Sequence, residues 1–259
     1  MIISNLKRKI ESKRFSKKTY WKFLVLLKDI IWFFYYSILY KIMNWPEVII
    51  DKIMNWPEVV FDRVYKEKKW GDKGGFFSGE GSLPKNTLNY RNYVEKFIKE
   101  NNIKKVLDLG CGDFRVGKLI NWNNAEYIGA DVVKSLIYRN NKLYSNKKIK
   151  FIKKNIIVNK LPDADLCLIR QVLQHLSNKD IKKIIKKIIK YRYILVTDSI
   201  SINPKKRLNL DIPRGRNRKY GLYLELPPFN QKSKIVLSYF EKNKKYILRT
   251  ILLENKRIK

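Results

Sequence analysis

Residues 104–120, KKVLDLGCGDFRVGKLI, decide the fold of this chain. An apolar run at 106–109 has the length of a buried strand, and two glycines follow it in a GxG turn. The next residues, DFRVGKLI, are expected to begin a helix that buries Phe114 and Val116. A strand, a glycine turn and a helix in this order open a nucleotide-binding βαβ unit. We therefore expect an α/β domain built on a mostly parallel sheet.

The polar group at the end of this strand distinguishes between nucleotide cofactors. The third glycine of the dinucleotide fingerprint is missing and Phe114 lies nearby, so a pyrophosphate would lose its close backbone contact. Asp108 lies at the strand end, where a carboxylate repels phosphate and attracts an amino group. S-adenosylmethionine has an amino-acid end and an adenosine but no phosphate, so the stretch favours S-adenosylmethionine.

Two later runs end in residues suited to an adenosine. AEYIGAD ends at Asp131, 23 residues after Asp108, and a carboxylate there can accept hydrogen bonds from both ribose hydroxyls. Val132 follows and can cover one face of the adenine. IKFIKKN ends at Asn155, whose side-chain amide can read the adenine edge. Alternatively, Asp131 caps a helix and Asn155 stabilises a turn, but their order and spacing favour the cofactor role.

The run ADLCLIR is typical of a buried parallel strand, and Arg170 ends it where such sheets bind ligands. His175, the only histidine in the chain, follows one helical turn later. An imidazole with a pKa near 6.5 suits removal of a proton from a hydroxyl acceptor; packing and substrate binding without proton transfer remain alternatives. Gln171 cannot act as a base, and Asp198, at the end of the fifth predicted strand, competes with His175. Arg170 either grips an acidic or hydroxylated substrate or pairs with Asp198.

Other patterns complete the expected domain. Residues 85–100 should form a helix before the first strand, and the tail has two alternating strands around EKNKK. The helical pattern that follows the histidine has an apolar stripe, Ile181, Ile184, Ile185 and Ile188. We expect a doubly wound, mostly parallel, seven-stranded sheet, preceded by an N-terminal helical extension.

These runs resemble the class I S-adenosylmethionine-dependent methyltransferases, and more narrowly a group of small methyltransferase domains associated with glycan or other small-molecule modification. The similarity covers residues 65–230, and its runs are YKEKKWGDKGGFFSGEGSLPKNT (65–87), VLDLGCGDF (106–114), YIGAD (127–131), LPDADLCLIRQVLQHLS (161–177), NLDIPRGRNR (209–218) and LPPFN (226–230). The glycine motif is common to the superfamily, whereas the Trp-Gly, SGxGS and PPFN runs are more specific. The resemblance implies a Rossmann-like fold, methyl transfer and S-adenosylmethionine as the cofactor.

The resemblance also implies roles for individual residues. With those named above, the cofactor-binding candidates are Tyr90, Asp108, Gly110, Cys111, Gly112, Asp131, Val132, Asn155 and Arg170. The substrate-binding candidates are Arg170, Asp211 and Arg218, of which the last two belong with Gly215 to a substrate-facing loop. Two features depart from the group: Arg170 precedes Gln171 where the group commonly has aspartate, and the stretch after Arg218 lacks the usual Arg-Pro pair.

The first sixty residues lie outside this resemblance. Residues 21–40 are the most apolar stretch, but three charged residues interrupt it, and a spanning helix needs roughly 20 apolar residues. Residues 1–22 carry eight Lys or Arg and one acid, so a spanning helix would export the domain away from cytosolic cofactor. Contact of residues 1–43 with an anionic membrane surface, or packing of the helix on protein, avoids this conflict.

An 11-residue tandem repeat follows the apolar stretch. KIMNWPEVIID (41–51) and KIMNWPEVVFD (52–62) match at nine of eleven positions. In each unit the proline and the glutamate after it suit the first turn of a helix. The repeat is either a spacer or a docking element that displays Trp45 and Trp56. We place the boundary between the extension, 1–62, and the methyltransferase domain, 63–259, after the second unit.

The composition leaves the partner open. Lys and Arg number 57 and Asp and Glu 23, and the net charge of +34 attracts nucleic acid, anionic lipid or an acidic substrate. Lysine is abundant throughout the chain, however, which also fits a coding bias. Cys111 and Cys167 form no CxxC pair, which excludes a disulfide framework or a zinc site and favours a reducing, cytoplasmic compartment. We therefore expect no metal, and the composition does not decide the oligomeric state.

Three functions remain in competition. The leading hypothesis is O-methylation of a sugar, a glycan precursor or a similar small polar acceptor. The alternative is methylation of RNA or another nucleic acid, favoured by the charge and by RGRNRKY at 214–220. A non-catalytic, membrane-associated adaptor that keeps the fold is the third, and the intact Asp108 and Asp131 argue against it.

Overall fold

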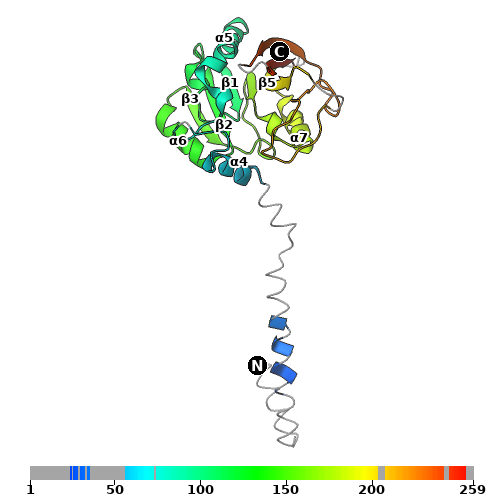
Figure 1. Cartoon of the computed structure of the whole chain (residues 1–259). Helices are drawn as coiled ribbons and strands as arrows, with labels where there is room; N and C mark the ends of the chain where they lie inside the picture. The colour runs from blue at the N-terminus through cyan, green and yellow to red at the C-terminus, as the bar shows by residue number, and fades with distance from the viewer. Residues whose placement is uncertain are drawn as a thin grey trace, which may run out of the picture. The chain divides into compact units, whose positions relative to one another are not determined.

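The computed structural model describes residues 24, 26–28, 30–32, 34–35, 56–72, 74–203, 208–241 and 245–254. The chain divides into two compact units, Met1–Met54 and Asn55–Lys259. In the first unit, the described residues between 24 and 35 are helical (Figure 1). No helix among the residues that the structure describes is long and apolar enough to cross a membrane. The basic segment before residue 24 and the first repeat unit lie outside the described residues.

The second unit contains a seven-stranded sheet in the order β3-β2-β1-β4-β5-β7-β6 (Figure 1). The strands are β1 Lys105–Leu109, β2 Glu126–Asp131, β3 Ile149–Lys153, β4 Leu166–Arg170, β5 Tyr193–Ser201, β6 Lys234–Phe240 and β7 Tyr246–Glu254. The first five strands pair in parallel, whereas β7 pairs antiparallel with β5 and β6. This topology confirms the doubly wound, mostly parallel sheet and the C-terminal pair of strands expected from the sequence.

Helices cover both faces of this sheet. They are α4 Pro57–Lys66, α5 Pro84–Glu100, α6 Lys134–Tyr144 and α7 Asn178–Ile188, with short 3-10 helices η1 Glu80–Ser82, η2 Gly117–Leu119 and η3 Leu173–His175. Successive strand residues point to opposite faces, so Val106 packs with Ile98 of α5 while Leu107 packs with Ile181 of α7. The predicted helix at 85–100 and the apolar stripe of α7 are both confirmed.

Helix α4 begins at Pro57, within the second unit of the tandem repeat, and continues into the residues that follow that unit. Pro57 occupies the first turn and Glu58 is the acidic residue of that turn, as predicted for each repeat unit. The helix continues to Lys66, across the boundary expected after residue 62, and the second compact unit begins at Asn55.

The α-helix predicted after the glycine turn is wrong, because residues 113–120 form turns and only the 3-10 helix η2. Phe114 adopts a left-handed backbone conformation with φ 59°, which an α-helix excludes. Its ring packs 5.1 Å from that of Tyr127 and 4.8 Å from that of Phe151, between ring centroids. Trp122 donates a hydrogen bond to the carbonyl of Gly117. Burial of these aromatic rings therefore decides the local backbone.

The strand register brings the predicted site residues to one edge of the sheet. Leu109 pairs with Ala130 of β2 and with Ile169 of β4, so Asp108, Asp131 and Arg170 lie near the carboxyl ends of three adjacent strands. Parallel sheets bind ligands at this edge because the loops that leave the strands meet there. The sheet therefore assembles a site from segments more than 60 residues apart.

Candidate functional site

A cavity of about 420 Å³ lies at this edge. Its walls come from the ends of β1, β2 and β4, from the loop at 78–82 and from α4. A volume in this range is typical of sites for small ligands. All nine cofactor candidates line the cavity, namely Tyr90, Asp108, Gly110, Cys111, Gly112, Asp131, Val132, Asn155 and Arg170.

The glycine turn forms the floor of the cavity. Gly110 and Gly112 have φ values of 79° and 55°, which side-chain-bearing residues rarely adopt. A β-carbon at Gly110 would collide with Val172, and one at Gly112 would collide with the hydroxyl of Ser78. Only glycine therefore lets the neighbouring loops close over the turn. Cys111 lies between them, and burial raises the pKa of its thiol well above the ordinary value, so the thiol stays neutral.

Two carboxylates stand at the ends of neighbouring strands. Asp108 accepts a hydrogen bond of 2.7 Å from the Tyr127 hydroxyl. Burial raises its pKa to about 6, although that hydrogen bond and the charge of Arg170 lower it. Asp131 accepts hydrogen bonds of 3.1 Å from the backbone N–H groups of Gly112 and Val133. Each carboxylate keeps lone pairs for a ligand, and the pair suits an ammonium group and two hydroxyls.

Asn155 lines the cavity, but its side-chain amide is already engaged. The Oδ1 atom accepts from the backbone N–H of Ile157 at 3.0 Å, which forms a turn. The Nδ2 atom donates to both carboxylate oxygens of Glu58, at 3.2 and 3.3 Å. The turn-stabilising alternative therefore describes the geometry of Asn155, and its amide ties α4 to the sheet.

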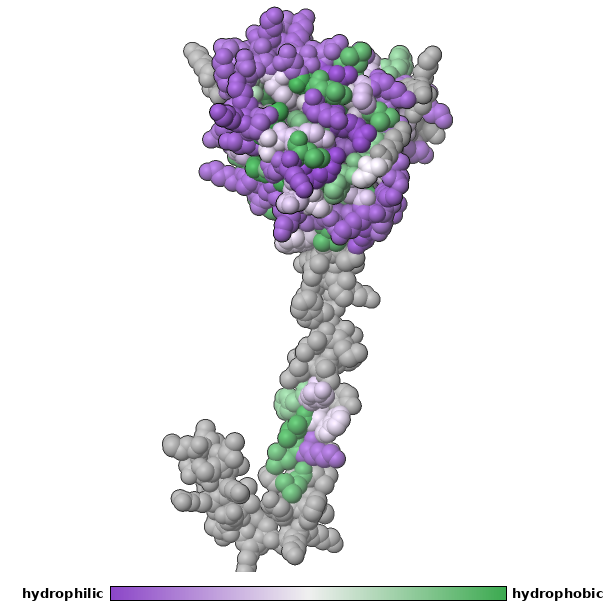
Figure 2. All heavy atoms as spheres, turned by 90° about the vertical axis from the view of Figure 1, so that its left-hand side faces the viewer, coloured by the Kyte–Doolittle hydropathy of each residue, from purple (hydrophilic) through white to green (hydrophobic). Residues whose placement is uncertain are grey.

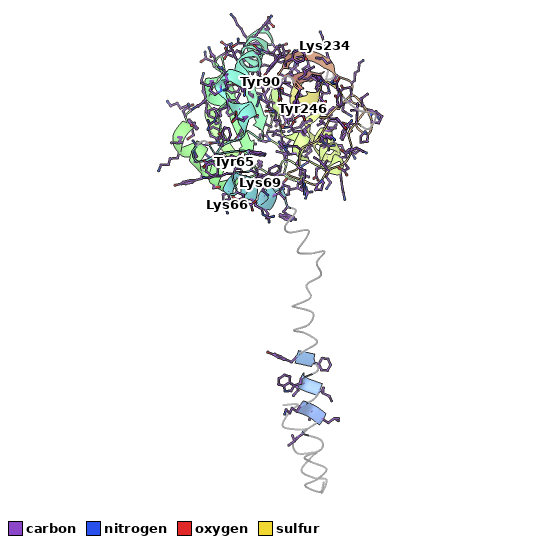
Figure 3. The ribbon with its side chains drawn as sticks, viewed as in Figure 1. Tyr65, Lys66, Lys69, Tyr90, Lys234 and Tyr246 are labelled. Carbon is purple, nitrogen blue, oxygen red and sulfur yellow. The ribbon has the colours of Figure 1, made fainter. Side chains whose placement is uncertain are left out.

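A roof of aromatic side chains, which the sequence analysis missed, covers the cavity. Phe61 and Tyr65, four residues apart on α4, line it together with Trp70. The Tyr65 hydroxyl is 2.9 Å from the hydroxyl of Ser78 and closes the space above the floor. Figure 3 shows Tyr65 and Tyr90 on two separate helices, α4 and α5. The i, i+4 spacing of the α4 aromatics was the available signal.

Arg170 joins the end of β4 to the loop at 78–82. Its Nη2 donates to the carbonyl of Gly81 at 2.7 Å, and its guanidinium lies 5.2 Å from the centre of the Tyr90 ring. The Nε atom is buried without a hydrogen-bond partner among the described residues. No ion pair with Asp198 occurs in the part of the chain that the structure describes, so that alternative is not supported.

His175 faces the cavity from η3 and is 7% exposed. Its ring lies 5.4 Å from that of Trp70, between centroids, and its Nε2 is 3.3 Å from the side-chain nitrogen of Gln174. The Nδ1 atom is buried and has no partner among the described residues. Burial lowers the pKa of the imidazole from the ordinary 6.5 to about 4, so the ring is neutral at physiological pH.

The structure does not bring Asp198, Asp211 and Arg218 to the cavity wall. Asp198 is 5% exposed, and burial raises its pKa to about 8, against the lowering effect of Arg218. Asp211 accepts from the backbone N–H of Asn178 at 2.7 Å, at the start of α7. Arg218 donates to the carbonyl of Leu176 at 2.7 Å. Asp211 and Arg218 therefore connect loops outside the cavity wall, whereas both carboxylate oxygens of Asp198 are buried without a hydrogen-bond partner among the described residues. The structure gives no support to the base and substrate-contact roles expected of these three residues.

Comparison with known proteins agrees with this geometry. Residues 107–191 match the methyltransferase domain family. The fold is similar to that of the methyltransferase domain of bacterial CtHen1, at 15% identity and a TM-score of 0.50, covering 65% of this chain and 98% of that chain. It is also similar to the N-methyltransferase NodS from Bradyrhizobium japonicum, solved with S-adenosyl-L-homocysteine, at 10% identity and a TM-score of 0.53, covering 74% and 98%. No curated protein matches the chain.

The site has a glycine floor and two carboxylates at strand ends, which suit the adenosine and the amino-acid end of S-adenosylmethionine. These features agree with the matches. Residues 107–191 therefore carry a methyltransferase domain, and the fold around it is similar to that of S-adenosylmethionine-dependent methyltransferases of known structure.

Proposed function

We propose that the protein methylates a hydroxyl group of a sugar, a glycan precursor or a similar small polar acceptor. The observation that carries this proposal is the cavity itself, because one cavity of about 420 Å³ is lined both by the glycine floor and by a group of polar side chains. An acceptor that reaches the floor must therefore be small or end in a slender group.

On the cofactor side, the proposal assigns the binding of S-adenosylmethionine to the floor. Asp131 would accept hydrogen bonds from the ribose hydroxyls, Asp108 would attract the amino group, and Gly110 and Gly112, which line the cavity, would let the ligand approach the backbone. The cofactor supplies an electrophilic methyl group on a sulfonium. The residues of the chain hold the two reactants in line, and alignment of this kind supplies much of the acceleration in such displacements.

On the acceptor side, the proposal rests on Trp70, Gln171, His175 and Asn217, which all line the cavity. An aromatic face beside a few polar groups suits a sugar, which has apolar C–H surfaces and hydroxyl donors. His175 is the candidate base. Its low pKa keeps the ring uncharged throughout the neutral range, so one of Nδ1 and Nε2 carries the ring proton and the other can accept a proton.

The nucleic-acid alternative loses part of its support in the structure. Arg214, in the RGRNRKY segment, donates through Nη2 to the carboxylate of Asp180 at 2.9 Å and also through Nε at 2.5 Å. Arg218 is committed to backbone carbonyls. Only Arg216 and Lys219 of this segment are exposed cations. The hydrogen bonds of Arg214 and Arg218 within the protein give these two arginines a structural role that needs no RNA ligand.

The first unit supports a second element of the proposal, contact with an anionic membrane surface. Its described apolar side chains are exposed, including Leu26 at 59%, Ile31 at 61% and Phe34 at 61%, and Figure 2 shows them along one segment. The eight Lys or Arg of residues 1–22 complement anionic headgroups. Co-sedimentation with vesicles of phosphatidylcholine, with and without phosphatidylserine, tests this element; loss of binding in Ile31→Asp/Phe34→Asp is expected, and no binding by the wild type refutes it.

Methyl transfer from labelled S-adenosylmethionine to defined acceptors tests the proposed function. The full chain is offered methyl glycosides, nucleotide sugars and total RNA at physiological salt, and methylated products are identified by mass spectrometry. Methylation of a sugar hydroxyl, unaffected by excess RNA, is the expected result. Methylation of RNA alone would refute the proposal and favour the alternative.

The His175→Ala variant distinguishes a role of His175 as the base from a role in packing. The base role predicts that turnover falls at least tenfold while cofactor affinity changes less than twofold. It also predicts an acid limb of the rate profile near pH 4 rather than 6.5, because the neutral ring is the active form and burial lowers its pKa. Unchanged turnover in this variant would exclude His175 as the base.

A further inference from the structure

We propose that Gln171 binds the nucleophilic group of the acceptor through its side-chain oxygen, and that Ser199 and Glu241 hold the amide in the orientation that this requires. This inference rests on the proposed function, methyl transfer to a hydroxyl group. Gln171 is the residue that replaces a potential base after the fourth strand, and its role is otherwise unexplained.

The backbone places Gln171 at the point where the cavity meets the sheet edge. It follows β4 directly, lines the cavity, and donates its backbone N–H to the carbonyl of Thr197 at 2.7 Å. Its φ is 53°, in the left-handed region that costs a glutamine conformational energy. A strained conformation of this kind persists where the surrounding structure enforces it, and such positions cluster at functional sites.

A chain of hydrogen bonds fixes which end of the amide faces the cavity. The Ser199 hydroxyl bonds to the carboxylate of Glu241, which can only accept, so Ser199 must be the donor in that bond. The Ser199 oxygen is then free to accept, and Gln171 Nε2 donates to it at 3.1 Å. Because Nε2 faces Ser199, Oε1 points to the other side of the amide.

The neighbourhood of Oε1 agrees with this direction. A β-carbon on Gly81, which also lines the cavity, would collide with Gln171 Oε1. Among the described residues no donor to Oε1 is found. Gln171 therefore presents to the cavity an oxygen that can only accept, and does so without carrying a charge.

An uncharged acceptor at this position selects the acceptor substrate. A hydroxyl donates its hydrogen to Oε1 and keeps its lone pairs for the methyl group, whereas a carboxylate is repelled. The residue thereby orients the nucleophile before transfer. Because the amide oxygen is not a base, the single hydroxyl proton must pass from Oε1 to a base such as His175 as the new methyl–oxygen bond forms. The chain of hydrogen bonds runs from Glu241, which follows β6, through Ser199 of β5 to Gln171, so Ser199 and Glu241 are positioning residues.

The kinetic test uses an acceptor that the wild-type full chain methylates. Gln171→Leu is expected to lower kcat at least tenfold with an unchanged Kd for S-adenosylhomocysteine. In Glu241→Gln the new amide can donate a hydrogen bond to the Ser199 oxygen, and the Ser199 hydroxyl can then donate to Gln171. The Gln171 amide would rotate so that Oε1 faces Ser199 and Nε2 faces the cavity, and kcat should fall about fivefold. The matched control is Glu126→Gln, an exposed glutamate on β2, which should leave kcat unchanged.

A double-mutant cycle separates this relay from general damage to the fold. Ser199→Ala breaks the chain, so adding Glu241→Gln to Ser199→Ala should have no further effect, and Ser199→Thr should restore kcat. Additive losses would overturn the relay. A Gln171→Leu enzyme with the kcat of the wild type would overturn the binding role.

Nuclear magnetic resonance observes the side-chain amide of Gln171 directly and requires no methyl transfer. The chain has three glutamines, Gln171, Gln174 and Gln231, so selective 15N labelling gives three side-chain amide signals, and Gln171→Leu assigns one of them. Glu241→Gln should shift that signal, and an unmoved signal contradicts the relay. If the signal shifts but no hydroxyl acceptor is ever methylated, the proposed function has failed and the acceptor role of Gln171 fails with it, while the relay stands.

Discussion

The floor and the roof of the cavity are built in different ways. The floor uses Asp108, Gly110, Gly112 and Asp131, which lie within 24 residues of one another on two neighbouring strands and in the turn that follows the first of them. The roof is tied down by contacts between distant segments, such as Glu58 with Asn155, 97 residues apart. A site made from two strands that follow one another in the chain is visible in the local sequence, whereas the roof depends on contacts between distant segments. The comparison implies that changes in the floor should be severe and changes in the roof graded.

The largest effect on cofactor binding is expected from Asp131→Ala in the floor. Removal of the carboxylate deletes the proposed ribose contact and two bonds that shape the turn, so the Kd for the cofactor should rise about 100-fold, roughly 3 kcal/mol. Calorimetric titration of S-adenosylhomocysteine into the full chain measures this. The control is Asp163→Ala, a 96% exposed aspartate paired with Lys190, and similar losses in both variants would contradict a specific role.

Asp198 sharpens the comparison because it is a buried carboxylate outside the cavity. Its pKa of about 8 means that the folded protein holds a proton that the unfolded chain releases above about pH 4. Stability is therefore lost as pH rises from about 4 to 8. Asp198→Asn should remove this loss and raise the free energy of unfolding by roughly 5 kcal/mol at pH 8. Urea denaturation at pH 5 and pH 8 checks it; an equal gain at both values would contradict the pKa assignment.

The pH dependence of cofactor affinity tests the other floor carboxylate. Asp108 has a pKa of about 6, so it is ionised at pH 7 and mostly protonated at pH 5. Because only the ionised form attracts an ammonium group, affinity should fall about tenfold between pH 7 and pH 5, roughly 1.4 kcal/mol. Binding measured across this range should become independent of pH in Asp108→Asn. A wild-type affinity that does not change with pH would show that Asp108 does not interact with the ammonium group of the ligand.

The smallest effect is expected in the roof. Glu58→Ala removes the acceptor of the Asn155 amide and frees α4 from the sheet edge, so cofactor should dissociate about fivefold faster, roughly 1 kcal/mol. Stopped-flow displacement of a fluorescent cofactor analogue measures the rate. The control on the same helix is Glu67→Ala, a half-exposed glutamate after the last turn of α4. A loss as large as that of Asp131→Ala would abolish the distinction between floor and roof.

Several features could be predicted because they follow from local patterns. The strand and glycine turn at 106–112, the acid 23 residues later and the apolar stripe of α7 all appear where the sequence indicated. The helix after the glycine turn failed because the positive φ of Phe114 depends on rings that lie on other strands. The same limit explains why the part of α4 up to residue 62 was assigned to an extension although Phe61 lines the cavity.

The sequence by itself determined the sheet, the glycine floor and the cofactor class, because periodicity, glycine conformation and charge act between residues that are close along the chain. Only the tertiary structure decided which polar residues face the ligand. Asp198, Asp211 and Arg218 were expected at the site and lie behind it, while Gln171 lies within it. Burial then set the pKa of His175, because desolvation depends on every segment that packs around the ring and not on the neighbours of the residue in sequence.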